Sequence, residues 1–123
     1  LDVSATVAGA TGNARDTTFL MEYILLNNPE ILTPTVTEYT RLYNQNGDYH
    51  DAHNTNNILA DIPNLLGSKT GYTDLAGGNL TIAFDAGYNR PVIVTVLGST
   101  RNERFSDVKK LVDEVQKTIS KQK

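Results

Sequence analysis

The chain has 123 residues, room for one domain at most, and its 39% hydrophobic and 20% charged residues are ordinary for a globular protein. Its net charge of −3 excludes the basic field of a nucleic-acid-binding domain, and the absence of cysteine excludes disulfides and thiol chemistry. No apolar run approaches the roughly 20 residues of a membrane span, and no signal peptide is recognisable, so with Leu1 as its first residue we expect a segment of a longer protein.

The N-terminal part predicts a loop followed by one helix. Residues 1–12 are small and polar, with two glycines, and favour a loop. Asn13 can cap a helix whose first turn carries Asp16, and the proline at position 29 ends it. The apolar residues recur at helical spacing: Phe19, Leu20, Tyr23, Ile24 and Leu26, with Met21 adding bulk. We expect this stripe to pack into a core, with no part in catalysis.

The next segment predicts a hairpin. Residues 29–32 favour a short helical turn, and residues 35–43, rich in threonine and tyrosine, favour a strand. Residues 44–48 contain the Asn-Gly turn signal, so residues 49–53 are expected to form the return strand. His50 and His53 would then face opposite sides of that strand, and no cysteine or acidic cluster joins them. We therefore predict no metal site.

Residues 67–74, Gly-Ser-Lys-Thr-Gly-Tyr-Thr-Asp, are the stretch best suited to chemistry. On an extended strand Lys69 and Gly71 point to one face and Thr70 to the other. Gly71 lets a ligand or a second backbone approach closely, so the row suits an anion or a peptide along a strand edge. A lysine in a glycine-rich turn explains the same residues, and Lys-Thr-Gly arises by chance in about 3% of chains of this length.

Two strands and a helix are expected after this stretch. Leu80, Ile82 and Phe84 alternate with more polar positions, as in a strand with one buried face. Residues 92–97 are almost continuously apolar and read as a strand buried on both faces. Short connections make these strands antiparallel neighbours, so residues 69–71 should lie antiparallel to a strand over 80–84. One helical stripe then follows, facing the sheet: Phe105, Val108, Leu111, Val112, Val115 and Ile119.

These features, in this order, resemble the C-terminal part of the catalytic domain of serine-type D-alanyl-D-alanine carboxypeptidases, the low-molecular-mass penicillin-binding proteins. The resemblance rests on Asn-Thr-Asn-Asn-Ile-Leu at 54–59, on Lys-Thr-Gly and its continuation to Leu80, on the strand ending Val-Leu-Gly at 96–98, and on the helix opened by Arg104. Lys-Thr-Gly is the third motif of penicillin-binding proteins, beside Ser-x-x-Lys and Ser-x-Asn. The resemblance is most specific over residues 54–112 and looser over 1–29, where Ala-Arg-Asp opens a helix.

The resemblance implies a role for each residue of this stretch. In the family a serine outside this segment attacks the D-Ala-D-Ala peptide bond, water releases the acyl-enzyme, and β-lactams trap the same serine. Lys69 would supply positive charge and bond to the serine of Ser-x-Asn, while Thr70 would bind the substrate's terminal carboxylate. Gly71 would let the substrate backbone run antiparallel to the strand, and the backbone N–H of Tyr72 would form half of an oxyanion hole, a donor that lowers the barrier by about 3 kcal/mol. Arg104 stands roughly where an arginine helps to bind the carboxylate, although it also reads as an ordinary charged residue of a first helical turn.

The chain contains two Ser-x-x-Lys patterns, at 106–109 and 120–123, and neither is expected to be catalytic. Serine and lysine three apart share a helix face, and a lysine can activate a serine. Both copies, however, follow Lys-Thr-Gly, whereas the family places its nucleophile well before it. Ser106 also sits beside an apolar helical stripe, so we expect it to be an ordinary helix residue.

We therefore expect an α+β fold, a partial penicillin-binding-protein or β-lactamase-like transpeptidase domain with antiparallel strands covered by a C-terminal helix. Residues 1–123 would be the C-terminal segment of one catalytic domain; the three-stranded sheet would have an unpaired edge and a poorly covered face. The parent would trim peptidoglycan stem peptides outside the cytoplasm, in the periplasm or at the cell surface, free or membrane-associated, and bind β-lactams without a cofactor. The segment alone, lacking the nucleophile, would be inactive and would pair with the rest of its parent or with itself. The alternative is a non-catalytic module that binds peptidoglycan peptides or a protein.

Overall fold

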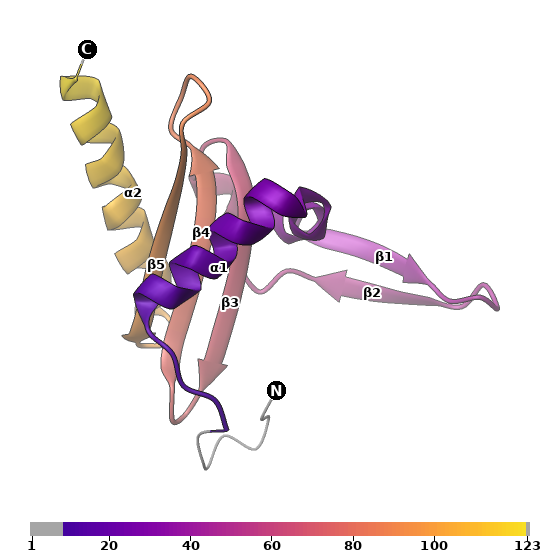
Figure 1. The fold of residues 1–123 in the computed structure, drawn as a ribbon. Helices are drawn as coiled ribbons and strands as arrows, with labels where there is room; N and C mark the ends of the chain where they lie inside the picture. Colours follow the sequence, from indigo (N-terminus) through magenta and orange to yellow (C-terminus); the bar gives the residue numbers. More distant parts are fainter. Residues whose placement is uncertain (1–8, 123) are drawn as a thin grey trace.

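The computed structural model describes residues 9–122 and has the predicted α+β architecture (Figure 1). Residues 9–12 are a loop, and the rest of the loop predicted over 1–12 lies outside the described residues. In chain order the elements are α1 (Ala14–Asn27), the 3-10 helix η1 (Pro29–Val36), β1 (Tyr39–Tyr43), β2 (Tyr49–His53), the 3-10 turn η2 (Leu59–Asp61), β3 (Leu65–Thr73), β4 (Gly77–Asp85), β5 (Pro91–Ser99) and α2 (Glu103–Lys121). None of the described helices is long and apolar enough to span a membrane.

The central sheet has the strand order β3-β4-β5, with both pairs antiparallel, as the short connections predicted. The expected burial of its strands is only partly right. The strand over residues 80–84 has buried side chains on both faces, because Leu80 and Phe84 face one helix and Ala83 faces the other. β5 packs on both faces, with Val94 on the α2 side and Ile93 on the α1 side, but it is an edge strand among the described elements and Leu97 is 39% exposed. The apolar content of a strand shows only that the strand can be buried. Its position in the sheet decides how many neighbours cover it, so the central strand β4 is more buried than the edge strand β5.

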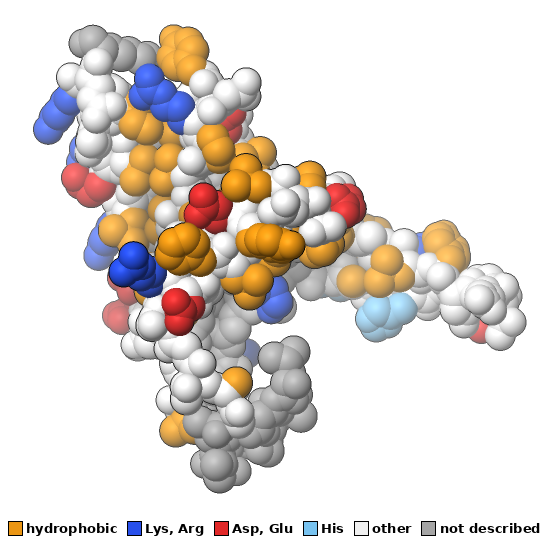
Figure 2. Space-filling view, viewed as in Figure 1, with side chains coloured by type: hydrophobic (Ala, Val, Ile, Leu, Met, Phe, Trp, Pro, Cys, Tyr) orange, Lys and Arg blue, Asp and Glu red, His pale blue; other side chains and the backbone are white. Residues whose placement is uncertain are grey.

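Helix α1 crosses one face of the sheet (Figure 1). The Oδ1 atom of Asn13 accepts a hydrogen bond from the Asp16 N–H at 2.8 Å, so the predicted cap is confirmed. Met21 is the buried residue of this helix and packs with Leu32 and Ala83, so this face is better covered than predicted. The predicted buried stripe is wrong in contrast, since four of its members are 58–68% exposed: Phe19, Leu20, Tyr23 and Leu26. Figure 2 shows hydrophobic side chains gathered along this outer side of α1.

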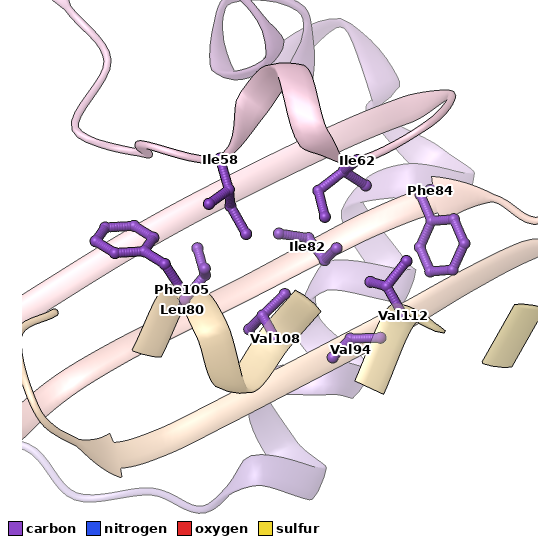
Figure 3. Packing of buried hydrophobic residues seen from close by; sticks show 9 residues of the cluster. All are labelled: Ile58, Ile62, Leu80, Ile82, Phe84, Val94, Phe105, Val108 and Val112. Atoms are coloured by element: carbon purple, nitrogen blue, oxygen red, sulfur yellow. The ribbon is translucent and has the colours of Figure 1, made fainter. Parts of the chain in front are cut away.

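Helix α2 covers the opposite face, as predicted, and closes the main core (Figure 3). Its stripe supplies Phe105, Val108 and Val112, all at most 7% exposed, whereas Leu111 is 44% exposed and lies off the contact. The buried cluster combines α2 with β4, β5 and the segment around η2: Ile58, Ile62, Leu80, Ile82, Phe84, Val94, Phe105, Val108 and Val112. This core fixes the start of α2 against the sheet.

Strands β1 and β2 form a separate two-stranded hairpin that projects away from the central sheet (Figure 1). The expected strand over 35–43 begins later, because η1 continues to Val36. Threonine and tyrosine content alone could not show that residues 29–36 form a 3-10 helix, which begins at Pro29 and contains Pro34. His50 pairs with Leu42 and His53 with Tyr39. Residues 9–122 contain no group of three His, Asp or Glu side chains suited to a metal ion.

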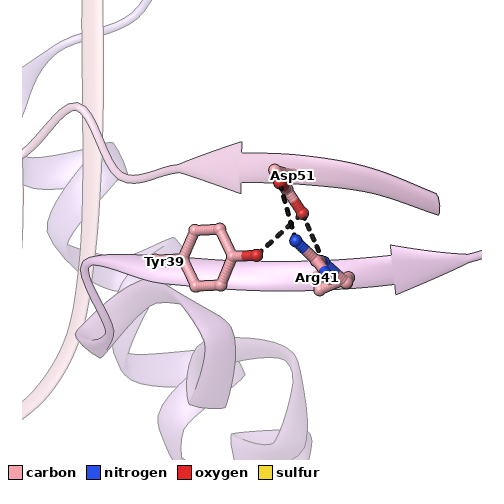
Figure 4. A network of polar contacts seen from close by, with 3 residues as sticks. All are labelled: Tyr39, Arg41 and Asp51. Carbon is pink, nitrogen blue, oxygen red and sulfur yellow. Dashed lines mark hydrogen bonds and ion pairs between the residues drawn. The ribbon is translucent and has the colours of Figure 1, made fainter.

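A polar network holds one face of this hairpin (Figure 4). The Asp51 carboxylate accepts a hydrogen bond from the Tyr39 hydroxyl at 2.8 Å and two from the Arg41 guanidinium at 2.8 and 3.2 Å. The Arg41 guanidinium also lies 4.0 Å from the centre of the Tyr49 ring. A hairpin with no third strand is marginally stable, so these contacts should matter for its order.

We expect the hairpin to loosen only in acid. The Arg41 donors, and next the Tyr39 hydroxyl, lower the pKa of Asp51 below its ordinary value of 3.8. A lowered pKa means that the stabilisation is complete above pH 3.8 and is lost as the pH falls through the lowered value. Amide chemical shifts of Thr40 and Ala52, measured between pH 2 and 8, should therefore change below about pH 4. Asp51→Asn should loosen the hairpin at every pH; a transition that begins well above about pH 4 in the unmodified protein would contradict the role of Asp51.

Candidate functional site

A pocket of about 450 Å³ opens between the C-terminal end of β3 and the start of α2. Strand β3 contributes Thr70, Gly71 and Tyr72, and the loop after β2 contributes Thr55. Arg101 and Arg104 line the side formed by α2 and the turn before it, and none of the lining residues is acidic. Two guanidinium groups without a lining carboxylate make this pocket suited to an anion.

The predicted strand placement of Lys-Thr-Gly is confirmed. Lys69 pairs with Thr81 and Gly71 with Asn79, in antiparallel register, and β3 is the outer strand of the described sheet. A Cβ atom added at Gly71 would meet only the Asn79 Cβ, at 4.0 Å. The edge of β3 beside Gly71 is thus open to the backbone of a ligand.

Thr70 is held toward the pocket by the loop after β2. Its hydroxyl shares a hydrogen bond with the hydroxyl of Thr55. Asn54 fixes the first residue of that loop through two hydrogen bonds. Its backbone N–H donates to the Glu38 carbonyl at 2.8 Å, and its Nδ2 donates to the Thr35 carbonyl at 2.8 Å. The segment 54–59, noted in the sequence only for its resemblance, therefore forms one wall of the pocket.

The start of β3 is anchored by a contact that no local sequence pattern indicates. The Ser68 N–H donates to Thr35 Oγ1 at 3.0 Å, and the Ser68 hydroxyl donates to the Thr35 carbonyl at 2.8 Å. Ser68 is 3% exposed, so its hydroxyl is committed to this link. The neighbouring Gly67 leaves space for Leu32, because a Cβ there would lie 2.9 Å from Leu32 Cδ1.

Arg104 is buried beneath the end of β3, which rules out its reading as an ordinary charged residue of a first helical turn. It is 6% exposed, and its Nη1 donates to the Gly71 carbonyl at 3.0 Å and more weakly to the Asn79 carbonyl at 3.5 Å. Desolvation, and next the positive charge of Arg101, lower the pKa of Arg104 from its ordinary value. Its Nε is buried without a hydrogen-bond partner in the described structure. Arg104 thus ties α2 to the carbonyl next to the predicted oxyanion donor, the N–H of Tyr72.

Arg101 is a pocket residue that sequence reasoning missed. Its guanidinium carbon lies 5.2 Å from the centre of the Tyr72 ring, and the Tyr72 hydroxyl donates to Asp74 Oδ1 at 3.1 Å. The signal available in the sequence was a second arginine three positions before Arg104, in a turn. Without the fold, nothing distinguished it from a solvated surface charge.

Lys69 lies outside this pocket. Side chains alternate along β3, so Lys69 faces the other side from Thr70, and its Nζ donates to the Thr70 carbonyl. Lys69 is exposed and forms no ion pair within residues 9–122. The structure therefore brings Thr70, Gly71, Tyr72 and Arg104 together and leaves the Lys69 ammonium, bonded to the Thr70 carbonyl, on the adjoining side of the strand.

Ser106 has the surroundings of an ordinary helix residue. Its hydroxyl donates to the Glu103 carbonyl at 3.0 Å, a local helix contact, and no hydrogen bond joins it to Lys109 in the described structure. The second Ser-x-x-Lys copy ends at Lys123, which lies outside the described residues.

Residues 5–101 match the family model for D-alanyl-D-alanine carboxypeptidases. Among solved structures, penicillin-binding protein D2 from Listeria monocytogenes in its ampicillin-bound form is 29% identical, with a TM-score of 0.72 over 87% of this chain and 43% of that one. Its cefotaxime-bound form is 26% identical, with a TM-score of 0.73 over 92% of this chain and 45% of that one. A penicillin-binding protein homologue from Mycobacterium tuberculosis, 15% identical with a TM-score of 0.63 over 85% of this chain and 41% of that one, shares the fold. A search of curated proteins gave no match, and the chain spans less than half the length of these structures.

Proposed function

The chain belongs to the D-alanyl-D-alanine carboxypeptidase family, and from this membership we propose that it is the C-terminal segment of a serine carboxypeptidase domain that trims peptidoglycan stem peptides and binds β-lactams. The observation that carries the proposal is Lys-Thr-Gly on an open edge strand, beside a pocket with two arginines and no acidic lining residue. A peptide ending in D-Ala-D-Ala presents both a backbone for such an edge and a carboxylate for such a pocket.

The geometry supports a division of labour among these residues. The open space at Gly71 would admit the substrate backbone alongside β3. Thr70, with Arg104 behind the strand, would receive the terminal carboxylate. A serine from outside this segment would attack the carbonyl carbon between the two D-alanines, releasing the last one as its amine. Water would then hydrolyse the resulting ester. The Tyr72 N–H would stabilise the oxyanion, and the exposed ammonium of Lys69 would supply positive charge on the neighbouring side.

Two uncovered surfaces support the proposal that the rest of the domain packs here. The outer edge of β5 is unpaired in the described sheet, and an apolar groove lies beside it, lined in part by Ile93, Leu111 and Ile119. The outer face of α1 is apolar and exposed as well (Figure 2). We propose that the remaining part of the parent domain covers both surfaces, outside the cytoplasm where peptidoglycan is found. Without that part, a second copy of the chain would compete for them.

A non-catalytic module that binds a stem peptide or a protein remains the second candidate, since β3 is open whether or not a serine is supplied. The full-length reading frame separates the two. Ser-x-x-Lys and Ser-x-Asn upstream of Leu1 would favour the enzyme, and their absence would favour the module.

The isolated 123-residue chain should neither cleave a D-Ala-D-Ala peptide nor keep a covalent penicillin adduct. Covalent catalysis needs an activated nucleophile, and in the described residues Ser68 and Ser106 are held by backbone carbonyls. Intact-mass spectrometry after penicillin treatment checks this, and an adduct on Ser106 would contradict it. Light scattering should show self-association; a monomer that unfolds cooperatively would mean that the segment is a more complete domain than proposed.

A further inference from the structure

The turn between β5 and α2 presents a second guanidinium at the mouth of the pocket. Arg101 is exposed, lines the pocket with Thr70 and Arg104, and has no ion pair within residues 9–122. Its guanidinium carbon lies 5.2 Å from the centre of the Tyr72 ring. The site thus holds one buried and one exposed arginine with no acidic lining residue to neutralise them.

The buried arginine is already committed to the protein. Arg104 donates through Nη1 to the Gly71 and Asn79 carbonyls and is 6% exposed. Turning it outward to a ligand would break its contact with β3 and leave the Gly71 carbonyl without this donor. Arg104 can lend its positive charge to the carboxylate from behind the strand, and a second, more exposed guanidinium would be needed for a direct contact that leaves this link intact.

The turn that carries Arg101 is held firmly. The Thr100 carbonyl packs so closely against Gly78 that a Cβ there would lie 2.0 Å from the oxygen. Thr100 Oγ1 accepts from the Glu103 N–H at 2.9 Å, and the Ser99 hydroxyl donates to Asp107 Oδ2 at 2.6 Å. Arg101 therefore has a fixed backbone position and an exposed side chain, an arrangement that suits a residue that contacts a ligand at the pocket mouth.

We propose that Arg101 is a specificity-determining residue that binds the C-terminal carboxylate of the substrate together with Thr70. This inference rests on the proposed carboxypeptidase function. In the free protein the Arg101 side chain lies against Tyr72, an exposed cation–π contact that is weaker than a charge-assisted hydrogen bond to a carboxylate. Substrate binding would move the guanidinium from the ring to the carboxylate, next to Arg104, whose charge no other group of the pocket balances.

The test uses the intact protein that contains this segment and two substrates, a stem-peptide mimic ending in free D-Ala-D-Ala and its C-terminal amide. Arg101→Gln should lower kcat/KM for the free acid by at least about tenfold, mainly through KM, and for the amide by less than about twofold. Arg101→Lys should recover part of the loss, because it keeps the charge but not the two-point geometry. Arg90→Gln, in the β4–β5 turn at the opposite end of the sheet, removes the same charge and should leave both substrates unchanged.

The outcomes separate this inference from the proposed function. If the unmodified protein releases no D-alanine and takes no penicillin, the carboxypeptidase proposal fails and Arg101 has no such role. If it is active and Arg101→Gln behaves like Arg90→Gln, only the role of Arg101 is overturned. Equal losses on acid and amide, with kcat falling as much as KM rises, would show that Arg101 supports the turn and does not read the carboxylate.

Discussion

Replacing Lys69 with alanine in the intact protein should abolish acylation by a fluorescent penicillin. Lys69 is exposed, its Nζ donates to the Thr70 carbonyl and it makes no ion pair in residues 9–122, so its removal should leave the fold intact. What disappears is the positive charge beside the proposed reaction centre. Thr70→Val should have a smaller effect, the loss of one hydrogen bond to a charged group, roughly 1.5–3 kcal/mol or about 10–150-fold in acylation rate.

A matched control is Lys109→Ala. Lys109 is exposed on α2, away from the pocket lining, and its removal changes the net charge by the same amount. Its labelling should equal that of the unmodified protein, as gel fluorescence over a time course would show. Near-normal labelling of Lys69→Ala would mean that Lys-Thr-Gly is a coincidence on this strand.

Gly78→Ala should cost the protein about 3 kcal/mol or more in free energy of unfolding, at the upper end of overpacking effects. The added Cβ would lie 2.0 Å from the Thr100 oxygen and 2.5 Å from the Thr100 carbon, and both are backbone atoms. Either β4 or the turn must move, and the turn also accepts the Arg104 N–H at 3.2 Å. Because Arg101 and Arg104 follow that turn, acylation should fall along with stability.

Gly71→Ala provides the comparison. Its Cβ would meet nothing closer than 4.0 Å within the described structure, so denaturant unfolding should show little change in stability. Acylation should still fall, because the methyl group would occupy the space proposed for the ligand backbone. If Gly78→Ala unfolds at the same denaturant concentration as the unmodified protein, the close packing of the turn against β4 is wrong.

Several features could be derived from the sequence because they depend on neighbours along the chain. The Asn13 cap, the Asn-Gly hairpin turn and the helix stripe of Phe105, Val108 and Val112 are all short-range patterns. The antiparallel arrangement of residues 69–71 beside the strand over 80–84 followed from a short connection. The family resemblance also required only order and spacing.

Other features were settled by tertiary structure alone. Whether β4 or β5 is central, which face of α1 is covered and what Ser68 contacts all depend on elements distant in the chain. The sequence left Arg104 open between a carboxylate-binding residue and an ordinary helix charge, because its burial depends on its contact with Gly71 of β3, 33 positions earlier. The position of Arg101 beside Tyr72 depends on the packing of the turn at Thr100 against Gly78. Local patterns encode which elements form and how they pair with close neighbours, whereas burial and the grouping of charges depend on long-range packing that no short stretch of sequence contains.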